Sequence, residues 1–559
     1  MDPAYPMSRI VLRALAACVT AALCASCSGG EGSSEGPGAG GNAGGVGSGA
    51  GSGAGGTASP ADVLTYHNDI ARTGQYLAET TLTPANVNAA HFGKVAFLAA
   101  DGKVDAEPLY AGNVSINGAT HNVVYVATEH ASVYAFDADT NTQLWRRSLL
   151  GSGETTSDSH SCSQITPEIG ITSTPVIDRS RGANGVLYAV AMSKDSNGAY
   201  HQRLHALDLA TGAELFGGPK EIAATYPGTG ANSTNGTVTF DPKQYAERQA
   251  LTLVSGNVYL AWTSHCDQQP YSGWVMAYSA DTLAQTSVLN VTPNGSEGSV
   301  WMSGAGMASD GASLYFLDAN GTFDTALNGN GFPSNGDYGN TFLKLAVSPK
   351  LAVADYFATF DTVAQSNRDQ DLGSGGALVL PDLIDANGAT RHLAVGAGKD
   401  SKIYVVDRDA MGKFNSTRNA IWQEIDGQLG GGVFGMPAYY GGGVYYGAVG
   451  DALKAFPITA AKLAATPSSK SAGTFAYPGT TPSVSANGAQ NAIVWAAENG
   501  SVGTLHAFNA SNLAQELYSS RQSGTRDSFG AGNKFITPMI AHGHVYVGAT
   551  NGVAVFGLL

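Results

Sequence analysis

The sequence predicts an all-β protein built from repeated antiparallel sheets, and three observations predict it. The 559-residue chain holds 73 Gly and only 13% charged residues, against about 7% Gly and about 25% charged residues in ordinary domains. Apolar, β-branched and aromatic residues occur in short runs bounded by Gly, Asn and Asp, a pattern typical of strands. The third observation is that these runs repeat along the chain. The composition disfavours coiled coils and long surface helices, and an apolar content of 43% excludes global disorder.

A Tyr-rich apolar strand is the clearest part of the repeat. A shorter strand, often containing Pro, precedes most copies, and an alternating strand follows. Eight copies are found, at residues 122–127, 186–190, 257–261, 313–317, 392–396, 443–447, 492–496 and 544–548. Four-stranded units repeated in this way predict an eight-bladed β-propeller with antiparallel blades. The count becomes seven if the weak fourth unit, residues 307–361, is an insertion.

The two ends of the repeat region predict how the ring closes. The last unit ends with residues 552–559 and leaves no chain for a fourth strand. Residues 94–99 lie upstream of the first full unit and match residues 143–147 in character. We therefore expect an N-terminal strand to complete the last blade, so that no sheet edge is left exposed. The propeller is expected to occupy residues 61–559.

The first 60 residues indicate export and tethering. Arg9 and Arg13 precede about ten apolar residues and then small residues, which is the pattern of a signal peptide over residues 1–27. Ala25 and Ser26 before Cys27 are similar to a bacterial lipobox, so we expect Cys27 to be lipidated. The alternative is ordinary cleavage that leaves a soluble periplasmic protein. Ser28 favours sorting to the outer membrane, and the Gly- and Ser-rich residues 28–60 predict a disordered tether.

The charge balance limits the class of partner. The formal net charge is −15 and the pI is about 5.1, whereas nucleic-acid binding requires a basic surface. We expect a monomer that binds no nucleic acid and reaches the membrane only through its lipid.

Two segments carry a recognisable spacing of Ala, Asp, Gly and an aromatic residue. The residues are Ala135, Asp137 and Trp145 in the first copy, and Ala206, Asp208, Gly212 and Phe216 in the second. The spacing resembles the tryptophan-docking motif of quinoprotein-type propellers, and the resemblance extends over about residues 62–559. In this motif the Asp caps the turn after the third strand, the Gly takes a positive φ, and the aromatic ring packs between neighbouring blades. The chain is thus similar to PQQ-binding-like β-propeller repeat proteins of bacteria.

The resemblance raises the question of a cofactor. Catalytic quinoproteins of this fold hold PQQ near the ring axis, and resemble one another in an adjacent Cys-Cys pair and in a calcium ion held by Glu, Asn and Asp. The five cysteines here are Cys18, Cys24, Cys27, Cys162 and Cys266, and no Cys-x-x-Cys-His haem motif occurs. Some sugar-oxidising quinoproteins also lack these features. We expect no cofactor, with PQQ and calcium as the alternative.

Cys162 and Cys266 are the two cysteines of the expected propeller. Both are predicted on loops at the same face, and an oxidising periplasm favours a disulfide between them. The alternative is a zinc site in which His160 and His265 join the two thiolates.

Polar residues directly after the second strands occupy equivalent places in the units. They are Glu129, Lys194, His265, Asp318, Lys399, Asp451, Glu498 and Asn551. If the units are equivalent, these residues ring one mouth of the central channel and form a candidate ligand site. Glu129, Lys194, His265, Lys399 and Glu498 are its candidate residues. The alternative is that they are solvated loop tips with local salt bridges.

The sequence thus predicts a non-catalytic, lipid-anchored propeller of the cell envelope that binds a protein, a carbohydrate or a small molecule. The alternative is a periplasmic PQQ-dependent dehydrogenase of alcohols or sugars. A hydrolase or lyase that uses carboxylates at the mouth is compatible with the fold, but no motif selects it.

Overall fold

The structure is a computed structural model that describes residues 58–559. The predicted leader, Cys27 and the tether up to residue 57 lie outside the described residues. Helix within the described chain is confined to α1 (Thr362–Ser366) and the single turns η1 (Met302–Gly304), η2 (Leu372–Ser374) and η3 (Ser520–Ser523). The described chain is therefore an all-β structure, as predicted, and none of its helices is long and apolar enough to cross a bilayer.

Most of the described strands form eight meanders of four strands, which we number as sheets 1 to 8, and short further strands extend these sheets or form small separate ones. Sheets 1 to 4 are β3 (Leu109–Ile116), β4 (Ala119–Ala127), β5 (Ser132–Asp137) and β6 (Gln143–Ser148); β9 (Val176–Asp178), β10 (Val186–Lys194), β11 (Tyr200–Asp208) and β12 (Lys220–Glu221); β17 (Thr252–Val254), β18 (Asn257–Ala261), β20 (Trp274–Ser279) and β21 (Gln285–Asn290); and β22 (Ala308–Ser309), β23 (Ser313–Leu317), β24 (Phe342–Ala346) and β25 (Ala352–Ala358).

Sheets 5 to 8 follow in chain order. They are β26 (Ala377–Val379), β29 (Leu393–Ala397), β30 (Ile403–Asp407) and β32 (Gln423–Ile425); β33 (Ala438–Tyr440), β34 (Gly443–Tyr446), β35 (Asp451–Thr459) and β37 (Ser469–Phe475); β38 (Ser483–Asn487), β39 (Gln490–Glu498), β40 (Thr504–Asn509) and β41 (Glu516–Ser519); and β42 (Met539–Ala541), β43 (His544–Ala549), β44 (Gly552–Leu558) and β2 (Phe92–Ala99). The weak fourth unit of the sequence is thus sheet 4.

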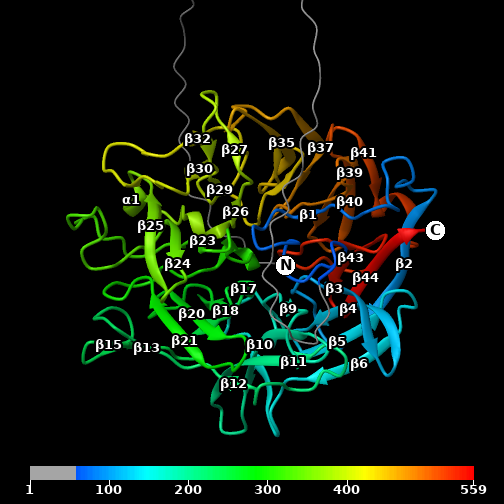
Figure 1. The fold of residues 1–559 in the computed structure, drawn as a ribbon, viewed down its shortest axis with the longest axis horizontal. Coiled ribbons are helices and arrows are strands. Elements are labelled where there is room, and N and C mark those ends of the chain that lie inside the picture. The colour runs from blue at the N-terminus through cyan, green and yellow to red at the C-terminus, as the bar shows by residue number, and fades with distance from the viewer. Residues whose placement is uncertain (1–57) are drawn as a thin grey trace, which may run out of the picture. The chain divides into compact units, whose positions relative to one another are not determined.

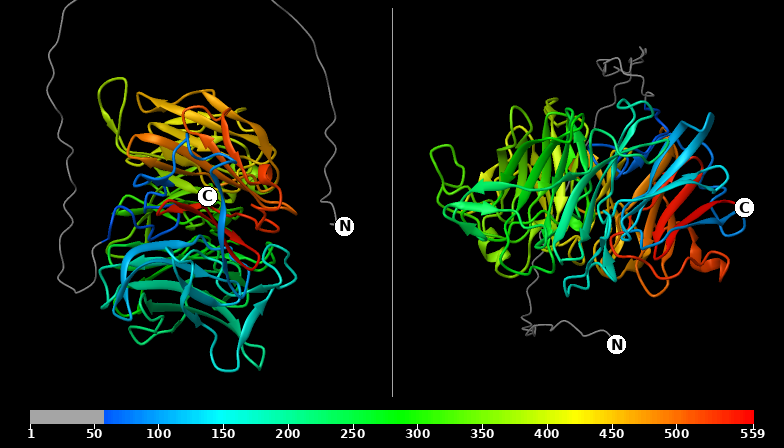
Figure 2. Two further views of the ribbon diagram at one scale, coloured as in Figure 1. Left: turned by 90° about the vertical axis from the view of Figure 1, so that its right-hand side faces the viewer. Right: turned by 90° about the horizontal axis from the view of Figure 1, so that it is seen from below.

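The sheets follow one another around a common centre, and the last sheet lies beside the first (Figure 1). Figure 2 shows the same sheets from two further sides. Buried apolar side chains join neighbouring sheets, and one cluster holds Phe136 of sheet 1, Trp495 of sheet 7 and Phe556 of sheet 8. This arrangement is a β-propeller, in which the first strand of each sheet is the inner one.

The predicted closing strand is confirmed. Strand β2 pairs antiparallel with β44, with Phe92 opposite Leu558 and Ala99 opposite Gly552. The sheet completed in this way takes its outer strand from the start of the described chain and its other three strands from the end.

A segment ahead of β2 binds the inner strands, and we call residues 63–77 the hub segment. It is dark blue near the centre of Figure 1. Its backbone carbonyl groups accept hydrogen bonds from the N–H groups of Tyr110, Ile177, Ser309, Val379, Tyr439 and Val484, at 2.6–3.0 Å. These donors belong to sheets 1, 2, 4, 5, 6 and 7.

Two side chains of the hub segment reach the remaining sheets. The Arg72 guanidinium donates to Thr252 Oγ1 of sheet 3 at 2.7 Å, and the Tyr76 hydroxyl accepts from the N–H of His542, next to β42, at 3.5 Å. The short strand β1 (Gln75–Tyr76) also pairs in parallel with β38. One segment therefore contacts all eight sheets near the centre.

The docking motif connects sheet 1 to sheet 2. Asp137 Oδ1 accepts from the N–H groups of the following turn, and Asp208 Oδ1 does the same in sheet 2. Trp145 donates from Nε1 to the carbonyl of Leu209 at 3.1 Å. Gly212 has a φ of +66° and lies against the Trp145 ring. The half-buried Phe216 packs at the edge of the apolar cluster between sheets 2 and 3.

The contact between Gly212 and Trp145 leads to a prediction. A Cβ on residue 212 would lie 2.8 Å from Trp145 Cε3, in addition to the strain of a positive φ. We expect Gly212→Ala to lower the free energy of unfolding by about 2–3 kcal/mol, measured by urea denaturation. Gly198 has a φ of +85° and nothing within 4 Å of its added Cβ, so Gly198→Ala carries the φ strain alone. Equal losses in the two variants would contradict the docking contact.

Candidate functional site

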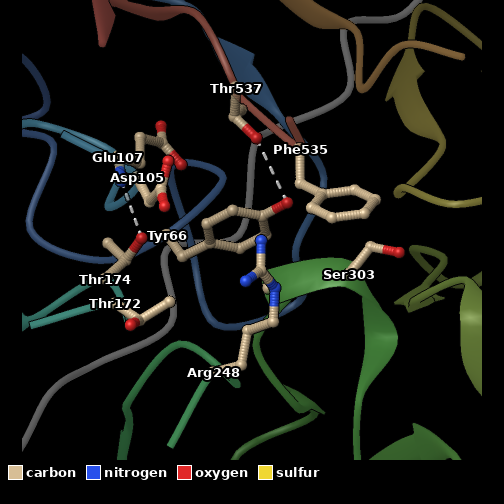
Figure 3. Close-up of a pocket in the computed structure, with 10 residues that line it drawn as sticks. Tyr66, Asp105, Glu107, Thr172, Thr174, Arg248, Ser303, Phe535 and Thr537 are labelled. Carbon is tan, nitrogen blue, oxygen red and sulfur yellow. Dashed lines mark hydrogen bonds between the residues drawn. The ribbon is translucent and has the colours of Figure 1, made fainter. Parts of the chain in front are cut away.

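A small pocket lies near the centre, and its walls come from the segments that directly precede the inner strands (Figure 3). We call it the axial pocket. It is lined by Tyr66, Asp105, Glu107, Thr172, Thr174, Arg248, Ser303, Gly304, Phe535 and Thr537. Its free volume of about 10 Å³ suits roughly one water molecule. Because inner strands of five different sheets begin here, residues far apart in the sequence meet at one place.

The hub segment forms the floor of the axial pocket. Its Tyr66 lies in the middle of Figure 3 and accepts a hydrogen bond from Thr537 Oγ1 at 3.2 Å. Thr174 lines the pocket, whereas Ile177, three residues further along the chain, binds the hub segment. Burial raises the pKa of Tyr66 above its usual range, so this hydroxyl keeps its proton.

Glu107 is a buried acid in the pocket wall. Its Oε2 accepts from the N–H of His67 at 2.8 Å, while Oε1 has no hydrogen-bond partner among the described residues. The Glu107 N–H donates to Thr174 Oγ1, which fixes the backbone. Burial raises the pKa of Glu107 to about 8, so the carboxyl group is largely protonated at neutral pH and can both donate and accept a hydrogen bond.

Arg248 is a buried cation on the other side of the pocket. Only 3% of this residue is exposed, and its Nε and Nη1 find no hydrogen-bond partner within residues 58–559. The guanidinium lies over the Phe535 ring, 4.6 Å from its centroid. Burial lowers the pKa of Arg248, and the carboxyl groups of Asp105 and Glu129 oppose this shift. Donors without partners are costly in a folded protein, so these nitrogens mark a place for a ligand or for water.

Phe535, which lines the pocket, also belongs to a group of four aromatic rings. Trp301, Phe434, Tyr477 and Phe535 contact one another in a closed cycle, with ring centroids 5.3–6.4 Å apart and planes 73–85° apart. Each ring comes from a segment ahead of a different sheet. Phe535 is buried, Trp301 and Phe434 are half-buried, and Tyr477 is 40% exposed. We call these four rings the aromatic cluster.

Of the five predicted mouth residues, Glu129 lies next to the axial pocket. It is fully buried, and its Oε2 accepts from the Gly170 N–H and from Thr172 Oγ1, both at 3.0 Å. Burial, together with the neighbouring Asp105, raises the pKa of Glu129 to about 8. Glu129 thus supports the wall that Thr172 presents to the pocket.

The other four predicted residues have local partners. Lys194 pairs with Asp158 at 2.9 Å, Lys399 with Asp371 at 2.8 Å, and Glu498 with His506 at 3.2 Å and with Arg521 at 3.1 Å. His265 stacks on His160 with centroids 4.0 Å apart. No hydrogen bond or ion pair within residues 58–559 joins any two of the five residues. Of the three further equivalent positions, Asp451 pairs with Lys454, Asp318 is fully buried, and the Asn551 carbonyl accepts from Ala100.

The predicted mouth residues stay a prediction, and the axial pocket is a second candidate site with other residues. Tyr66, Arg248 and Phe535 were missed because each follows no repeated pattern of residue type. The available signal was the position of Thr174-Pro175 and Thr537-Pro538 at the start of inner strands, since the residues there converge on the centre.

The predicted disulfide is present between Cys162 and Cys266, whose Cα atoms lie 5.6 Å apart. The sulfur atoms bond to each other and so do not act as zinc ligands. Burial lowers the pKa of His265 to about 3, which keeps this ring neutral. Within the described range, no three His, Cys, Asp or Glu side chains are arranged to hold a metal ion.

The disulfide spans 104 residues and links the loop ahead of sheet 2 to sheet 3. We expect the double variant Cys162→Ser with Cys266→Ser to lose about 2–4 kcal/mol of unfolding free energy, measured by urea denaturation without reductant. A reducing agent should destabilise the native protein and leave the double variant unchanged. Equal sensitivity of both proteins to reductant would contradict a stabilising disulfide.

Comparison with known proteins adds the fold family. No family model and no curated protein sequence matches the chain. Quinohemoprotein alcohol dehydrogenase from Comamonas testosteroni is similar in structure, with a TM-score of 0.58, 14% identity, and coverage of 89% of this chain and 80% of that chain. A quinohemoprotein alcohol dehydrogenase from Pseudomonas putida HK5 has a TM-score of 0.57 at 13% identity, with coverage of 89% of this chain and 80% of that chain. A europium-containing methanol dehydrogenase has a TM-score of 0.54 at 12% identity, with coverage of 89% of this chain and 98% of that chain.

The fold is a quinoprotein-type β-propeller. At 12–14% identity the similarity shows the fold alone, so the site must be judged on its own residues.

The axial pocket does not fit PQQ as its side chains are placed. PQQ is a flat tricyclic molecule with three carboxylate groups, whereas the free volume is about 10 Å³. Arg248 is also the only cation among the residues that line the pocket, so a ligand with three carboxylates would find a single basic partner there.

Proposed function

We propose that this protein is a non-catalytic binding module of the bacterial cell envelope that takes a small polar ligand at the axial pocket. The proposal is carried by one observation: buried polar atoms without hydrogen-bond partners lie together in the lining of the axial pocket. Arg248 offers two nitrogens and Glu107 offers one oxygen, all without hydrogen-bond partners among the described residues. Convergent polar groups beside aromatic rings are the usual composition of a ligand site.

A periplasmic PQQ-dependent dehydrogenase of alcohols or sugars is the second candidate. It is favoured by the structural similarity to quinoprotein dehydrogenases and disfavoured by the small volume of the axial pocket and by its single lining cation. Purified full-length protein separates the two candidates. PQQ with calcium is added, and absorption of the bound quinone and dye reduction by a panel of alcohols and sugars are recorded. The binding proposal predicts neither signal. Substrate-dependent dye reduction that requires PQQ would support the dehydrogenase and contradict the binding module.

We further propose that the mature chain is anchored to the outer membrane through a lipid on Cys27. The lipobox-like residues Ala25 and Ser26 and the following Ser28 support this proposal. Metabolic labelling with a palmitate analogue should mark the native protein and not the Cys27→Ala variant. Cys24→Ala is the matched control and should stay labelled. Equal labelling of the native protein and Cys27→Ala would contradict the anchor.

A further inference from the structure

Phe535 belongs both to the lining of the axial pocket and to the aromatic cluster. Its ring contacts Trp301 at 5.3 Å and Tyr477 at 6.4 Å, and the Arg248 guanidinium stacks on it at 4.6 Å. Figure 3 shows the ring beside Arg248, at the edge of the pocket. Phe535 is thus the side chain that separates the unpaired Arg248 nitrogens from the outer aromatic rings.

The backbone at this place is strained. Phe535 has a φ of +64°, a conformation that bulky side chains rarely adopt. Met302 and Ser303, in the neighbouring η1 turn, have φ values of +43° and +54°. Strain of this kind is concentrated at ligand clamps and switching segments. A change in the φ of Phe535 would relieve strain and carry the ring away from the pocket.

Removal of the ring would join two voids. Phe535 lines the axial pocket and also a second void of about 10 Å³. Phe434 of the aromatic cluster also lines the second void. With the phenyl ring displaced, the space that it leaves would connect Arg248, which lines the first void, to Phe434, which lines the second, next to Trp301.

The lining of the joined cavity selects the ligand chemistry. Arg248 needs an acceptor, Glu107 Oε1 needs a partner, and Trp301 and Phe434 offer apolar ring faces. A sugar ring satisfies all three demands because its hydroxyl groups both donate and accept, while its C–H face packs on aromatic rings. Asp105 lines the same pocket as Arg248, and its carboxyl group favours the charged form of the guanidinium. Because an acid of the pocket already interacts with this cation, and because the chain carries a net charge of −15, we take the saccharide to be neutral.

We propose that Phe535 is a gate, and that a neutral saccharide enters when its ring swings out and one sugar ring takes its place between Arg248 and Trp301. This proposal rests on the proposed function, because it assigns the ligand class and the entry route of the same axial pocket.

The test uses full-length protein, stopped-flow mixing and a panel of neutral disaccharides, with Trp301 fluorescence as the signal. Glucuronic acid and PQQ with calcium are the anionic arms. Phe535→Gly introduces a residue that adopts a positive φ without strain, so we expect the loop to keep its conformation. We expect this variant to associate with the disaccharide about ten times faster than the native protein. Arg248→Met should weaken binding about thirtyfold.

Two controls fix the interpretation. Phe97→Ala removes an exposed ring on β2 and should leave the association rate and the affinity for the disaccharide unchanged. Trp301→Phe should remove most of the fluorescence change, while calorimetry still records binding.

Three outcomes would overturn the proposal, and they differ from one another. If the native protein binds a disaccharide and Phe535→Gly shows the same association rate, the gate is wrong and the binding function stands. If glucuronic acid or PQQ binds and the neutral disaccharides do not, the ligand class is wrong. If neither the native protein nor Phe535→Gly binds any member of the panel at the axial pocket, the proposed function fails together with the gate.

Discussion

Replacing Arg72 with methionine is expected to lower the free energy of unfolding by about 3–5 kcal/mol, because the guanidinium joins the hub segment to sheets 3 and 4. Arg72 is fully buried, although burial lowers its pKa to about 10. It donates to Thr252 Oγ1 at 2.7 Å and to the carbonyl of Met307 at 3.1 Å. Within the hub segment it donates to Thr65 Oγ1 and to the Tyr66 carbonyl, at 2.7 and 2.8 Å. Methionine fills much of the space and removes all of these hydrogen bonds, and the Met307 carbonyl keeps Thr252 Oγ1 as a donor at 3.1 Å.

Urea denaturation followed by circular dichroism measures this effect. Arg147→Met is the matched control, since Arg147 is exposed on β6 and should change stability by less than about 0.5 kcal/mol. A loss below about 1 kcal/mol in Arg72→Met would show that the hub segment contributes little to holding the sheets together.

Phe92→Ala is expected to cost about 3–5 kcal/mol, the usual result of deleting a fully buried phenyl ring. Phe92 begins the closing strand β2, and its ring lies 4.9 Å from that of Tyr518 and 5.4 Å from that of Trp495 in sheet 7. The loss removes packing at the point where the two ends of the propeller meet. Thermal or urea unfolding of the purified variant provides the measurement.

The same strand supplies the control. Phe97 lies five residues further along β2 and is 40% exposed, so Phe97→Ala should cost less than about 1 kcal/mol. Similar losses in both variants would contradict the placement of Phe92 at the closure, because only its burial distinguishes the two rings.

The repeated strands and the closing strand were predictable because they depend on local patterns. Tyr125 and Tyr546 stand in apolar runs of one kind, and the segment around Lys94 has the alternation of an outer strand. The disulfide was predictable because Cys162 and Cys266 had no other partner in the expected propeller.

The hub segment could not be predicted from such patterns. Its residues bind the sheets mainly through backbone carbonyl groups, as Leu64 and Gly74 do, and backbone groups are the same in every sequence. Its side chains also follow neither a helical nor a strand period, because each faces a different sheet around the centre.

The residues of the axial pocket could not be predicted for a related reason. Charged residues such as Lys194 and Lys399 at exposed loops find the nearest acid, and a sequence does not show which acid will be nearest. Arg248 and Phe535 stand 287 positions apart in the numbering and meet because their sheets share one centre. Their proximity can therefore be recognised only when the three-dimensional arrangement of the sheets is known.

The central claim is that a ligand binds at the axial pocket, beside Phe535 and the other rings of the aromatic cluster. Hydrogen–deuterium exchange of the full-length protein, with and without a saturating neutral disaccharide, tests it most directly. The account predicts slower exchange in residues 301–304, 434–436, 477–481 and 533–537, which surround the aromatic cluster, and no change in the outer strands β6 and β41. Protection confined to outer strands, or spread evenly over the sheets, would contradict it.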